Sequence, residues 1–306
     1  MMNRLADLIR RKNAPVVVGL DPQLSFIPDR ILRPAYMERG DALGACALAL
    51  MIFNKEIIDA VYDLVPAVKL QSAMYEMFGV SGIDAYRDTI SYAHGKGLIV
   101  MADVKRGDIG STSEAYAKAH LGSVDAGGHV RYPFDADIAT VNPYLGTDGI
   151  QPFLDVCRAE GKGIFVLVKT SNPSGKEFQD LICEGRPLYE HVAERMAALG
   201  ESVREGEYSL LGAVTGATYP EEGRRLRELM PHQMLLVPGY GAQGATGRDL
   251  RAFFKEDGTG AIINSSRGII AAWQKEAFNP EHHDDAGACA RLAVQAMIGD
   301  LRKALD

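Results

Sequence analysis

Short apolar segments alternate with longer amphipathic segments along the whole chain. The short segments hold five to nine residues, are rich in Val, Ile and Leu, and are bounded by Gly, Pro or charged residues. This pattern is typical of strands that are buried on both faces. Eight such strands are predicted, at residues 15–20, 67–71, 98–104, 138–142, 164–170, 210–218, 234–240 and 261–266.

The longer segments between the strands carry apolar residues at helical spacing. Examples are residues 42–65, 82–97, 187–203 and 221–230, each of which can bury one face. Strands that alternate with helices predict repeated βα units and a parallel sheet. Eight units of this kind fit an α/β fold that is a single (β/α)8 TIM barrel, and a doubly wound sheet is the structural alternative.

The chain is predicted to form one domain that spans residues 1–306. No internal repeat, low-complexity tract or Pro-rich linker divides it, and barrels of this class commonly exceed about 200 residues. Three connections are long, at residues 122–137, 172–187 and 274–286. We interpret them as surface excursions rather than domain boundaries.

Charge and composition narrow the classes of partner. The net charge is −7, so the chain lacks the basic face expected of a nucleic-acid-binding protein, and no polybasic segment suggests a membrane surface. A small anionic substrate stays compatible with this charge, because a local pocket of Lys, Arg and helix N-termini can be positive.

Cysteine spacing and the N-terminal segment bear on location. The four cysteines form no CxxC pair, so neither a zinc site nor a disulfide framework is indicated. No apolar run reaches the roughly 18 residues of a membrane span, and the first residues lack the apolar core of a leader sequence. These features predict a cytoplasmic protein with reduced cysteines.

Polar residues at the ends of the apolar strands are the candidates for chemistry. In a barrel the active site lies at the C-terminal ends of the strands. A charged group there is costly unless it is paired or used. The strand ends carry Asp21, Lys69, Asp103, Lys105, Lys169 and Arg267, and the segment Thr170-Ser171-Asn172 follows the fifth strand.

The densest cluster is DVKRGDIGST, at residues 103–112. Asp103 and Lys105 are two apart, so in an extended segment both face one side, and a turn at Gly107 can redirect Asp108. A structural ion-pair network at the barrel rim is one interpretation. Adding Lys69 to the cluster favours a functional site over a structural network, because burying two lysines and two aspartates in one cavity destabilises the fold.

The last two strands run into a different kind of segment. PGYGAQGATG, at residues 238–247, offers backbone amides beside several glycines, and NSSRG, at residues 264–268, adds hydroxyls and the guanidinium of Arg267. Two tight turns alone would explain the glycines. The combination, at the frequent phosphate position of this barrel class, predicts a phosphorylated small ligand. No metal or redox cofactor site is indicated, and His282-His283-Asp284-Asp285 is interpreted as a solvated loop.

These motifs resemble those of the orotidine 5'-phosphate decarboxylase family, in its longer bacterial-type (type 2) branch. DVKRGDIGST matches the family pattern DxKxxDI. Further matches are GLDP at 19–22, VKLQ at 68–71, KTSNPS at 169–174, PGYGAQG at 238–244 and SSRG at 265–268. They occur in the family's order and cover almost the full chain. The resemblance implies a homodimer that converts orotidine 5'-monophosphate into uridine 5'-monophosphate (UMP) and carbon dioxide, with no cofactor and no metal.

The resemblance also implies roles for the catalytic positions. Lys105 would deliver the proton to C6 of the pyrimidine as carbon dioxide departs. Asp103 would lie beside the substrate carboxylate and hold Lys105, and Lys69 would link Asp103 to the ribose hydroxyls. Asp108 would reach into the neighbouring subunit's site.

Further positions are implied to bind substrate. Ile109 and Thr112 would follow Asp108 into the neighbouring site, and Asp21 would bind the ribose. Ser171 would bind the pyrimidine edge, although Thr170 and Asn172 beside it are alternatives. Gln243 and Arg267 would bind the phosphate.

Two other functions compete with this assignment. A magnesium-dependent sugar-phosphate decarboxylase or synthase of the same barrel superfamily shares the DxKxxD pattern, but an acidic metal ligand would be expected where this chain has Lys69. A barrel that only binds a phosphorylated ligand would have no need for the complete set of Lys69, Asp103, Lys105 and Asp108.

Overall fold

Eight parallel strands close into a barrel in the computed structural model, which describes residues 1–216, 220–241, 246–281 and 283–305. Each predicted strand segment contributes one of them, so the predicted TIM barrel is confirmed and the doubly wound sheet is excluded. In order around the barrel the strands are β1 (Val16–Leu20), β2 (Ala67–Gln71), β3 (Ile99–Arg106), β6 (Ile138–Val141), β7 (Gly163–Lys169), β12 (Leu211–Thr215), β13 (Leu235–Pro238) and β14 (Ala261–Ser265).

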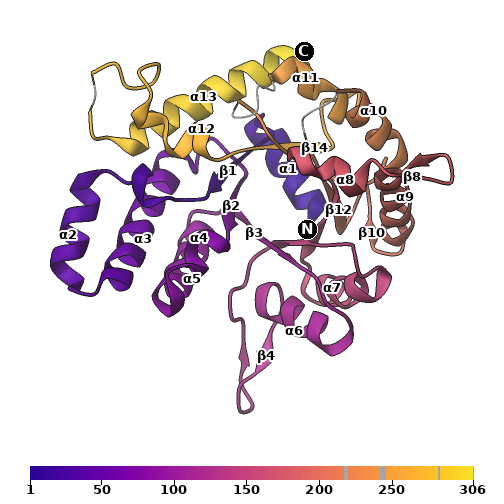
Figure 1. Cartoon of the computed structure of the whole chain (residues 1–306), viewed down its shortest axis with the longest axis horizontal. Coiled ribbons are helices and arrows are strands. Elements are labelled where there is room, and N and C mark those ends of the chain that lie inside the picture. The colour runs from indigo at the N-terminus through magenta and orange to yellow at the C-terminus, as the bar shows by residue number, and fades with distance from the viewer. Residues whose placement is uncertain (217–219, 242–245, 282, 306) are drawn as a thin grey trace.

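Helices surround the barrel (Figure 1). The helices with more than one or two turns are α1 (Met2–Lys12), α2 (Asp29–Arg39), α3 (Ala42–Val61), α5 (Gly79–Gly95), α6 (Gly110–His120), α7 (Thr147–Glu160), α9 (Leu188–Glu201), α10 (Pro220–Leu229) and α13 (Ala286–Leu305). The four predicted helical segments correspond to α3, α5, α9 and α10. Within the described ranges, no helix is both long and apolar enough to cross a membrane.

Short elements fill the connections. Four-residue helices are α4 (Ala73–Glu76), α8 (Lys176–Gln179), α11 (Gly247–Leu250) and α12 (Arg267–Ile270). The 3-10 turns are η1 (Leu24–Phe26), η2 (Pro173–Gly175), η3 (Arg251–Phe253) and η4 (Ala272–Gln274). Three small hairpins pair β4 (Val124–Asp125) with β5 (Val130–Arg131), β8 (Ile182–Cys183) with β9 (Arg186–Pro187), and β10 (Arg204–Glu205) with β11 (Tyr208–Ser209).

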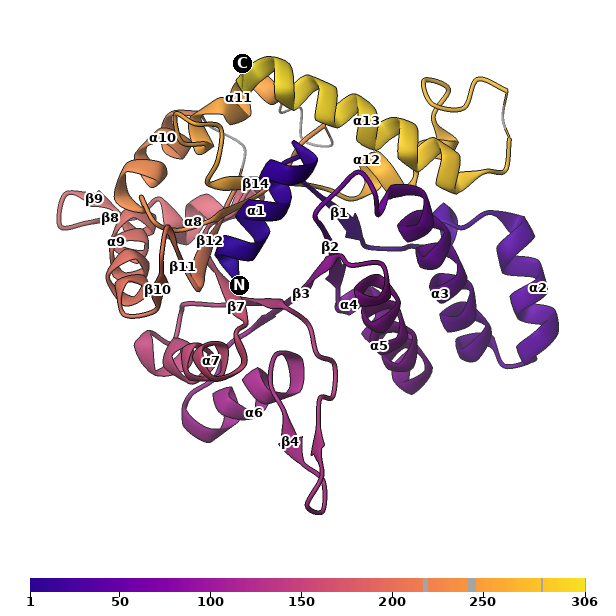
Figure 2. The same cartoon turned by 180° about the vertical axis from the view of Figure 1, so that it is seen from behind.

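Two apolar layers hold the barrel together. The outer layer lies between the strands and the surrounding helices. The inner layer fills the barrel with side chains such as Val17, Ile99 and Phe165, and it includes the apolar face of α1. Because Met2 and Leu5 of α1 are buried in this inner cluster, the helix closes the N-terminal end of the barrel, and both views show it across the centre (Figures 1 and 2).

The three long connections lie at different ends of the barrel. Residues 122–137 lead from α6 into β6, so they belong to the N-terminal end, where the hairpin β4–β5 projects beyond α6 in both views (Figures 1 and 2). Residues 172–187 lead from β7 into α9, and residues 274–286 lead from the segment after β14 into α13. Only the second and third connections therefore lie at the end where the strands finish.

Candidate active site

Strand register places the predicted cluster above the apolar interior. The β2–β3 ladder pairs Ala67 with Ile99, Lys69 with Met101 and Gln71 with Asp103. Ala67, Ile99 and Met101 belong to the inner apolar cluster. Since alternate residues of a strand face the same side, Lys69, Gln71 and Asp103 continue this inward row toward the C-terminal end.

Asp103 is the centre of the cluster and is only 7% exposed. Its Oδ1 accepts hydrogen bonds from Lys105 Nζ (2.5 Å) and Thr140 Oγ1 (2.9 Å). Its Oδ2 accepts from Lys69 Nζ (2.8 Å) and Gln71 Nε2 (3.2 Å). Lys69 Nζ also lies 3.4 Å from Oδ1 of Asp21. The structure thus joins Asp21, Lys69, Asp103 and Lys105, which the sequence placed at separate strand ends.

The ion pairs keep these buried groups charged. Burial alone would raise the pKa of Asp103, but Lys69 and Lys105 hold that pKa well below its usual range. Burial alone would lower the pKa of Lys69, but Asp21 and Asp103 raise it above its usual value. At neutral pH Asp103 is therefore a carboxylate that lies between Nζ of Lys69 and Nζ of Lys105.

Lys105 is the member of the cluster that is open to a ligand. Its side chain is 44% exposed, against 5% for Lys69 and 10% for Asp103. An ammonium group that is held by a carboxylate and still faces the barrel mouth can stabilise negative charge on a bound molecule and donate a proton to it.

The predicted reason for the Asp103–Lys105 contact is wrong, although the contact itself is present. The β3–β6 ladder shifts register between Ala102 and Arg106, and Lys105 has a φ of 46°. The two side chains therefore do not meet by the alternation of a regular strand. A left-handed residue within a bulge turns the Lys105 side chain back toward Asp103.

Asp108 does not join the cluster of its own chain. Its Oδ1 accepts the amide of Ile109 (2.8 Å) just before α6, and among the described residues it forms no ion pair with Lys69 or Lys105. Ile109 is 56% exposed, and Thr112 on the first turn of α6 is also exposed. Among the described residues, the second aspartate that pairs with these lysines is Asp21, and Asp108 does not take this place within its own chain.

The segment after β7 carries Ser171 between two residues that bind each other. Thr170 accepts a hydrogen bond from Gln179 Nε2 (2.7 Å) and donates to Asn172 Oδ1 (2.6 Å), so both neighbours of Ser171 are engaged. The Ser171 hydroxyl has no hydrogen-bond partner within the described ranges. A side chain at Gly216 would come within 2.7 Å of the Ser171 amide, so this glycine lets the segments after β7 and β12 meet.

Lys169, at the end of β7, forms its ion pairs outside the Asp103 cluster. It is 4% exposed, pairs with Asp180 and lies 3.9 Å from Glu222, with its ammonium group 4.6 Å from the ring centre of Tyr189. These partners belong to the segment 172–187, α10 and α9. Lys169 therefore ties the mouth segments to the helical layer and is not part of the Asp103 cluster.

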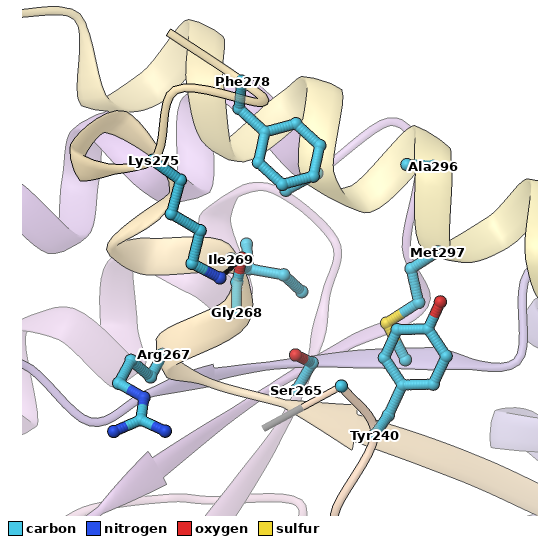
Figure 3. A pocket seen from close by; sticks show the side chains of 11 residues that line it. Tyr240, Ser265, Arg267, Gly268, Ile269, Lys275, Phe278, Ala296 and Met297 are labelled. Atoms are coloured by element: carbon cyan, nitrogen blue, oxygen red, sulfur yellow. Dashed lines mark hydrogen bonds between the residues drawn. The ribbon is translucent and has the colours of Figure 1, made fainter. Parts of the chain in front are cut away.

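A pocket of about 520 Å³ lies beside the segment after β14 (Figure 3). Ser265, Arg267, Gly268 and Lys275 supply its polar lining, and Tyr240, Phe278 and Met297 supply apolar surface. Figure 3 shows the Lys275 ammonium directed at Gly268, whose carbonyl lies 3.4 Å away. Burial, and then the neighbouring Arg267, lower the pKa of Lys275. Two cations beside the start of α12 suit an anionic group such as a phosphate.

Close packing explains one glycine of the predicted motifs near this pocket. A side chain at Gly19 of GLDP would come within 1.9 Å of Ser266 Oγ, so only glycine lets β1 and the segment after β14 approach in this way. Gln243, the other predicted phosphate ligand, lies outside the described residues.

Several residues of the site were not assigned by the sequence. Thr140 and Gln71 bind Asp103, and Lys275 lines the pocket with Arg267. Thr140 could have been found as the single hydroxyl in the apolar strand 138–141, because a buried polar side chain requires a partner. Gln71 shares the inward alternation of Lys69. Lys275 lies in an irregular connection, where no sequence periodicity identifies it.

Acidic side chains are not arranged for metal binding in the part of the chain that the structure describes. No group of three or more His, Cys, Asp or Glu side chains there could hold a metal ion. At the strand-two position the structure confirms a lysine paired with two aspartates.

The chain is similar to known proteins over almost its whole length. The sequence profile of the Orotidine 5'-phosphate decarboxylase / HUMPS family matches residues 15–278. An orotidine 5'-phosphate decarboxylase from Rhodopirellula baltica is 46% identical over 89% of this chain and 88% of its own. One from Caldicellulosiruptor saccharolyticus is 41% identical over 99% and 98%. A solved structure of a putative orotidine-monophosphate-decarboxylase from Toxoplasma gondii has a TM-score of 0.78 at 30% identity, covering 99% of this chain and 97% of that one.

Proposed function

The chain belongs to the orotidine 5'-phosphate decarboxylase / HUMPS family, and on this premise we propose that it decarboxylates orotidine 5'-monophosphate to UMP at the Asp103 cluster. One observation carries the proposal: Asp103 binds two lysines, and only Lys105 is open to the barrel mouth. A reaction that builds negative charge on a ring carbon needs such a fixed ammonium group.

The reaction divides into bond breaking and protonation. The bond between C6 and the carboxylate breaks, carbon dioxide leaves, and the electron pair stays on C6. Lys105 stabilises this pair and then donates a proton from Nζ to C6, after which solvent reprotonates the amine. The electron pair forms on a ring carbon that has no electron sink, so the barrier is intrinsically high. The transition state therefore needs stabilisation toward the upper part of the roughly 8–23 kcal/mol that enzymes supply.

Other parts of the substrate fit other parts of the mouth. The 5'-phosphate suits the pocket of Arg267 and Lys275, with Gln243 as a further ligand, and the ribose hydroxyls suit Asp21 and Lys69. Of the three candidates for the pyrimidine edge, Ser171 is favoured because Thr170 and Asn172 already bind each other. Binding energy from the phosphate can then position the reacting ring.

The magnesium-dependent sugar-phosphate chemistry has less support. The two relatives and the solved structure reported above carry the name of an orotidine 5'-phosphate or orotidine-monophosphate decarboxylase, and Lys69 occupies the position where an acidic metal ligand would be expected. The proposed reaction is the last step of UMP synthesis.

The cysteines bear on where the protein is located. Four free cysteines, three of them buried, are consistent with the cytoplasmic location that we also propose.

We further propose that the active form is a homodimer. Among the described residues Asp108 forms no ion pair with the lysines of its own cluster. Ile109 and Thr112 are exposed beside it, so these residues are available to a second copy. Asp108 of one subunit would then complete the alternating charges of the neighbouring subunit's site, and Ile109 and Thr112 would contact the substrate there. In a twofold dimer the same contact occurs twice.

The first experiment measures loss of orotidine 5'-monophosphate absorbance in EDTA. We expect wild-type turnover to survive the chelator and Lys105→Ala to lose several orders of magnitude of kcat. Lys96→Ala, which removes a partly exposed, ion-paired lysine just after the outer helix α5, is the matched control and should keep wild-type activity. Absence of wild-type turnover, or its loss in EDTA, would refute the proposal.

A mixing experiment tests the shared site. Lys105→Ala and Asp108→Ala should each be inactive alone. After subunit exchange at equal amounts, about a quarter of all sites would combine an intact Lys105 with an intact Asp108 from the partner, so about a quarter of wild-type activity should return. If no activity returns while mass analysis shows mixed dimers, Asp108 acts within its own chain.

A further inference from the structure

We propose that Thr140 is a positioning residue for the proton donor: its hydroxyl holds the backbone of Lys105 and the carboxylate of Asp103 in one arrangement. The inference rests on the proposed function, because it assigns Lys105 the role of proton donor. Thr140 lies on β6, is 1% exposed, and is outside the family motif that the sequence shows.

The bulge in β3 creates the need for this residue. The ladder pairs Ala102 with Ala139 and resumes with Arg106 and Val141. Three residues of β3, 103–105, therefore face the single residue Thr140 of β6. On its other side Thr140 stays in register with Phe165 of β7, so β6 itself remains regular.

The side chain of Thr140 replaces the missing ladder bond. Its Oγ1 accepts the backbone N–H of Lys105 (2.9 Å) and donates its own proton to Oδ1 of Asp103 (2.9 Å). Asp103 Oδ1 is the same oxygen that accepts Lys105 Nζ. The hydroxyl therefore closes a ring that includes the backbone, the side chain and the counterion of Lys105.

The backbone of Lys105 adopts a left-handed conformation that a residue with a side chain does not favour, so surrounding contacts must hold it. Four non-glycine residues of the described chain have positive φ: Asn13 at the end of α1, Asp135 and Glu184 in irregular or turn segments, and Lys105. Lys105 alone among them lies in a barrel strand. A left-handed conformation is unfavourable for a residue with a side chain and persists where surrounding contacts fix it.

A hydroxyl is required because both of its hydrogen-bonding roles are used. Valine has the shape of threonine but can neither accept the Lys105 amide nor donate to Asp103. In Thr140→Val the amide loses its partner inside the bulge, and β3 can relax toward a regular strand. The Lys105 ammonium then moves relative to the reacting carbon, and a displacement of about 1 Å costs about a hundredfold in rate.

The test compares Thr140→Val, Thr140→Ser and Thr89→Val. We expect Thr140→Val to lower kcat by about a hundredfold while its affinity for UMP stays within about threefold of wild type, because Lys105 is misplaced but the binding groups are not. Thr140→Ser keeps both hydrogen bonds and should recover kcat to within about fivefold. Thr89, a fully buried threonine of α5 that also makes two hydrogen bonds, controls for loss of a buried hydroxyl and should change stability without changing kcat.

A crystal structure of Thr140→Val separates this inference from the proposed function. We expect Lys105 to leave the left-handed region and its Nζ to leave Asp103, an outcome that needs no turnover. If the φ of Lys105 and the 2.5 Å contact are unchanged, Thr140 does not position Lys105. If the wild type turns over orotidine 5'-monophosphate and Thr140→Val matches it, the inference fails while the proposed function stands.

Discussion

Asp103 and Asp137 are buried aspartates at opposite ends of the same barrel, 7% and 5% exposed. Asp103 lies near the C-terminal end of β3 and holds the ammonium groups of Lys69 and Lys105. Asp137 lies just before β6, at the N-terminal end. Its Oδ2 lies 2.9 Å from Nε2 of His94, and the ammonium group of Lys162 is 3.9 Å from its Oδ1.

The difference lies in what each carboxylate holds. Asp137 accepts the backbone amide of Val100 (2.9 Å), and its own amide and carbonyl bind Val100 and Gly163, so it joins the starts of three strands. The side chain of Lys162, the lysine beside Asp137, is 11% exposed, whereas the side chain of Lys105 is 44% exposed. Burial alone would raise the pKa of Asp137, but His94 and Val100 lower it. Similar chemistry thus fixes the backbone at one end and presents a reactive cation at the other.

The largest effect should come from removing the charge of Asp103. Asp103→Asn keeps the shape but withdraws the counterion that holds Lys105, so we expect kcat to fall by about a thousandfold or more. Steady-state turnover of orotidine 5'-monophosphate measures this loss. If kcat of Asp103→Asn stays within tenfold of wild type, the carboxylate of Asp103 does not hold Lys105 for catalysis, and the contrast with Asp137 fails.

The matched substitution at the other end should change stability instead. Asp137→Asn weakens charge-assisted hydrogen bonds, and we expect the free energy of unfolding to fall by about 2 kcal/mol with kcat unchanged. Urea unfolding monitored by circular dichroism measures the first quantity. A large loss of kcat in a folded Asp137→Asn protein would contradict the assignment of this end to structure.

The stability difference should also depend on pH. The folded-state pKa of Asp137 is lowered, so its contribution is fully present above the unfolded value of about 3.9 and is lost as the pH falls through the lower folded value. The gap in unfolding free energy between wild type and Asp137→Asn should therefore be present at about pH 5 and shrink below about pH 4. A gap that widens on acidification would mean that Asp137 is not the ionised partner.

Two buried lysines that flank β7 sharpen the comparison further. Lys162, just before the strand, pairs with Asp135 (2.8 Å), and Lys169, at its end, pairs with Asp180. Because Lys169 fixes the segment that carries Ser171, Lys169→Met should raise KM about tenfold, whereas Lys162→Met should leave KM unchanged and only lower stability. Equal effects on KM would show that the mouth segment is not held through Lys169.

The smallest effect is expected from the hairpin β4–β5. It belongs to the N-terminal end, so replacing residues 125–130 with a short Asn-Gly turn should leave kcat and KM within about twofold of wild type. A marked loss of activity would mean that this hairpin serves the active site indirectly, for example through the dimer.

Much of this protein could be predicted from its sequence. The eight strands followed from short Val- and Ile-rich segments between helical ones, because burial on both faces of a parallel strand imposes that pattern locally. The residues of the cluster could be named because Asp21, Lys69, Asp103 and Lys105 interrupt or end apolar strands, where an unused charge is costly.

Only the tertiary structure decided how those residues meet. The bulge between Ala102 and Arg106, the left-handed Lys105 and the hydroxyl of Thr140 depend on how β3 packs against β6, and no spacing within β3 encodes that register. Whether Asp108 reaches the lysines of its own chain depends likewise on where α6 begins. Periodicity reports which face of a strand is buried, whereas the contacts of a single side chain depend on neighbours that lie far away in the chain.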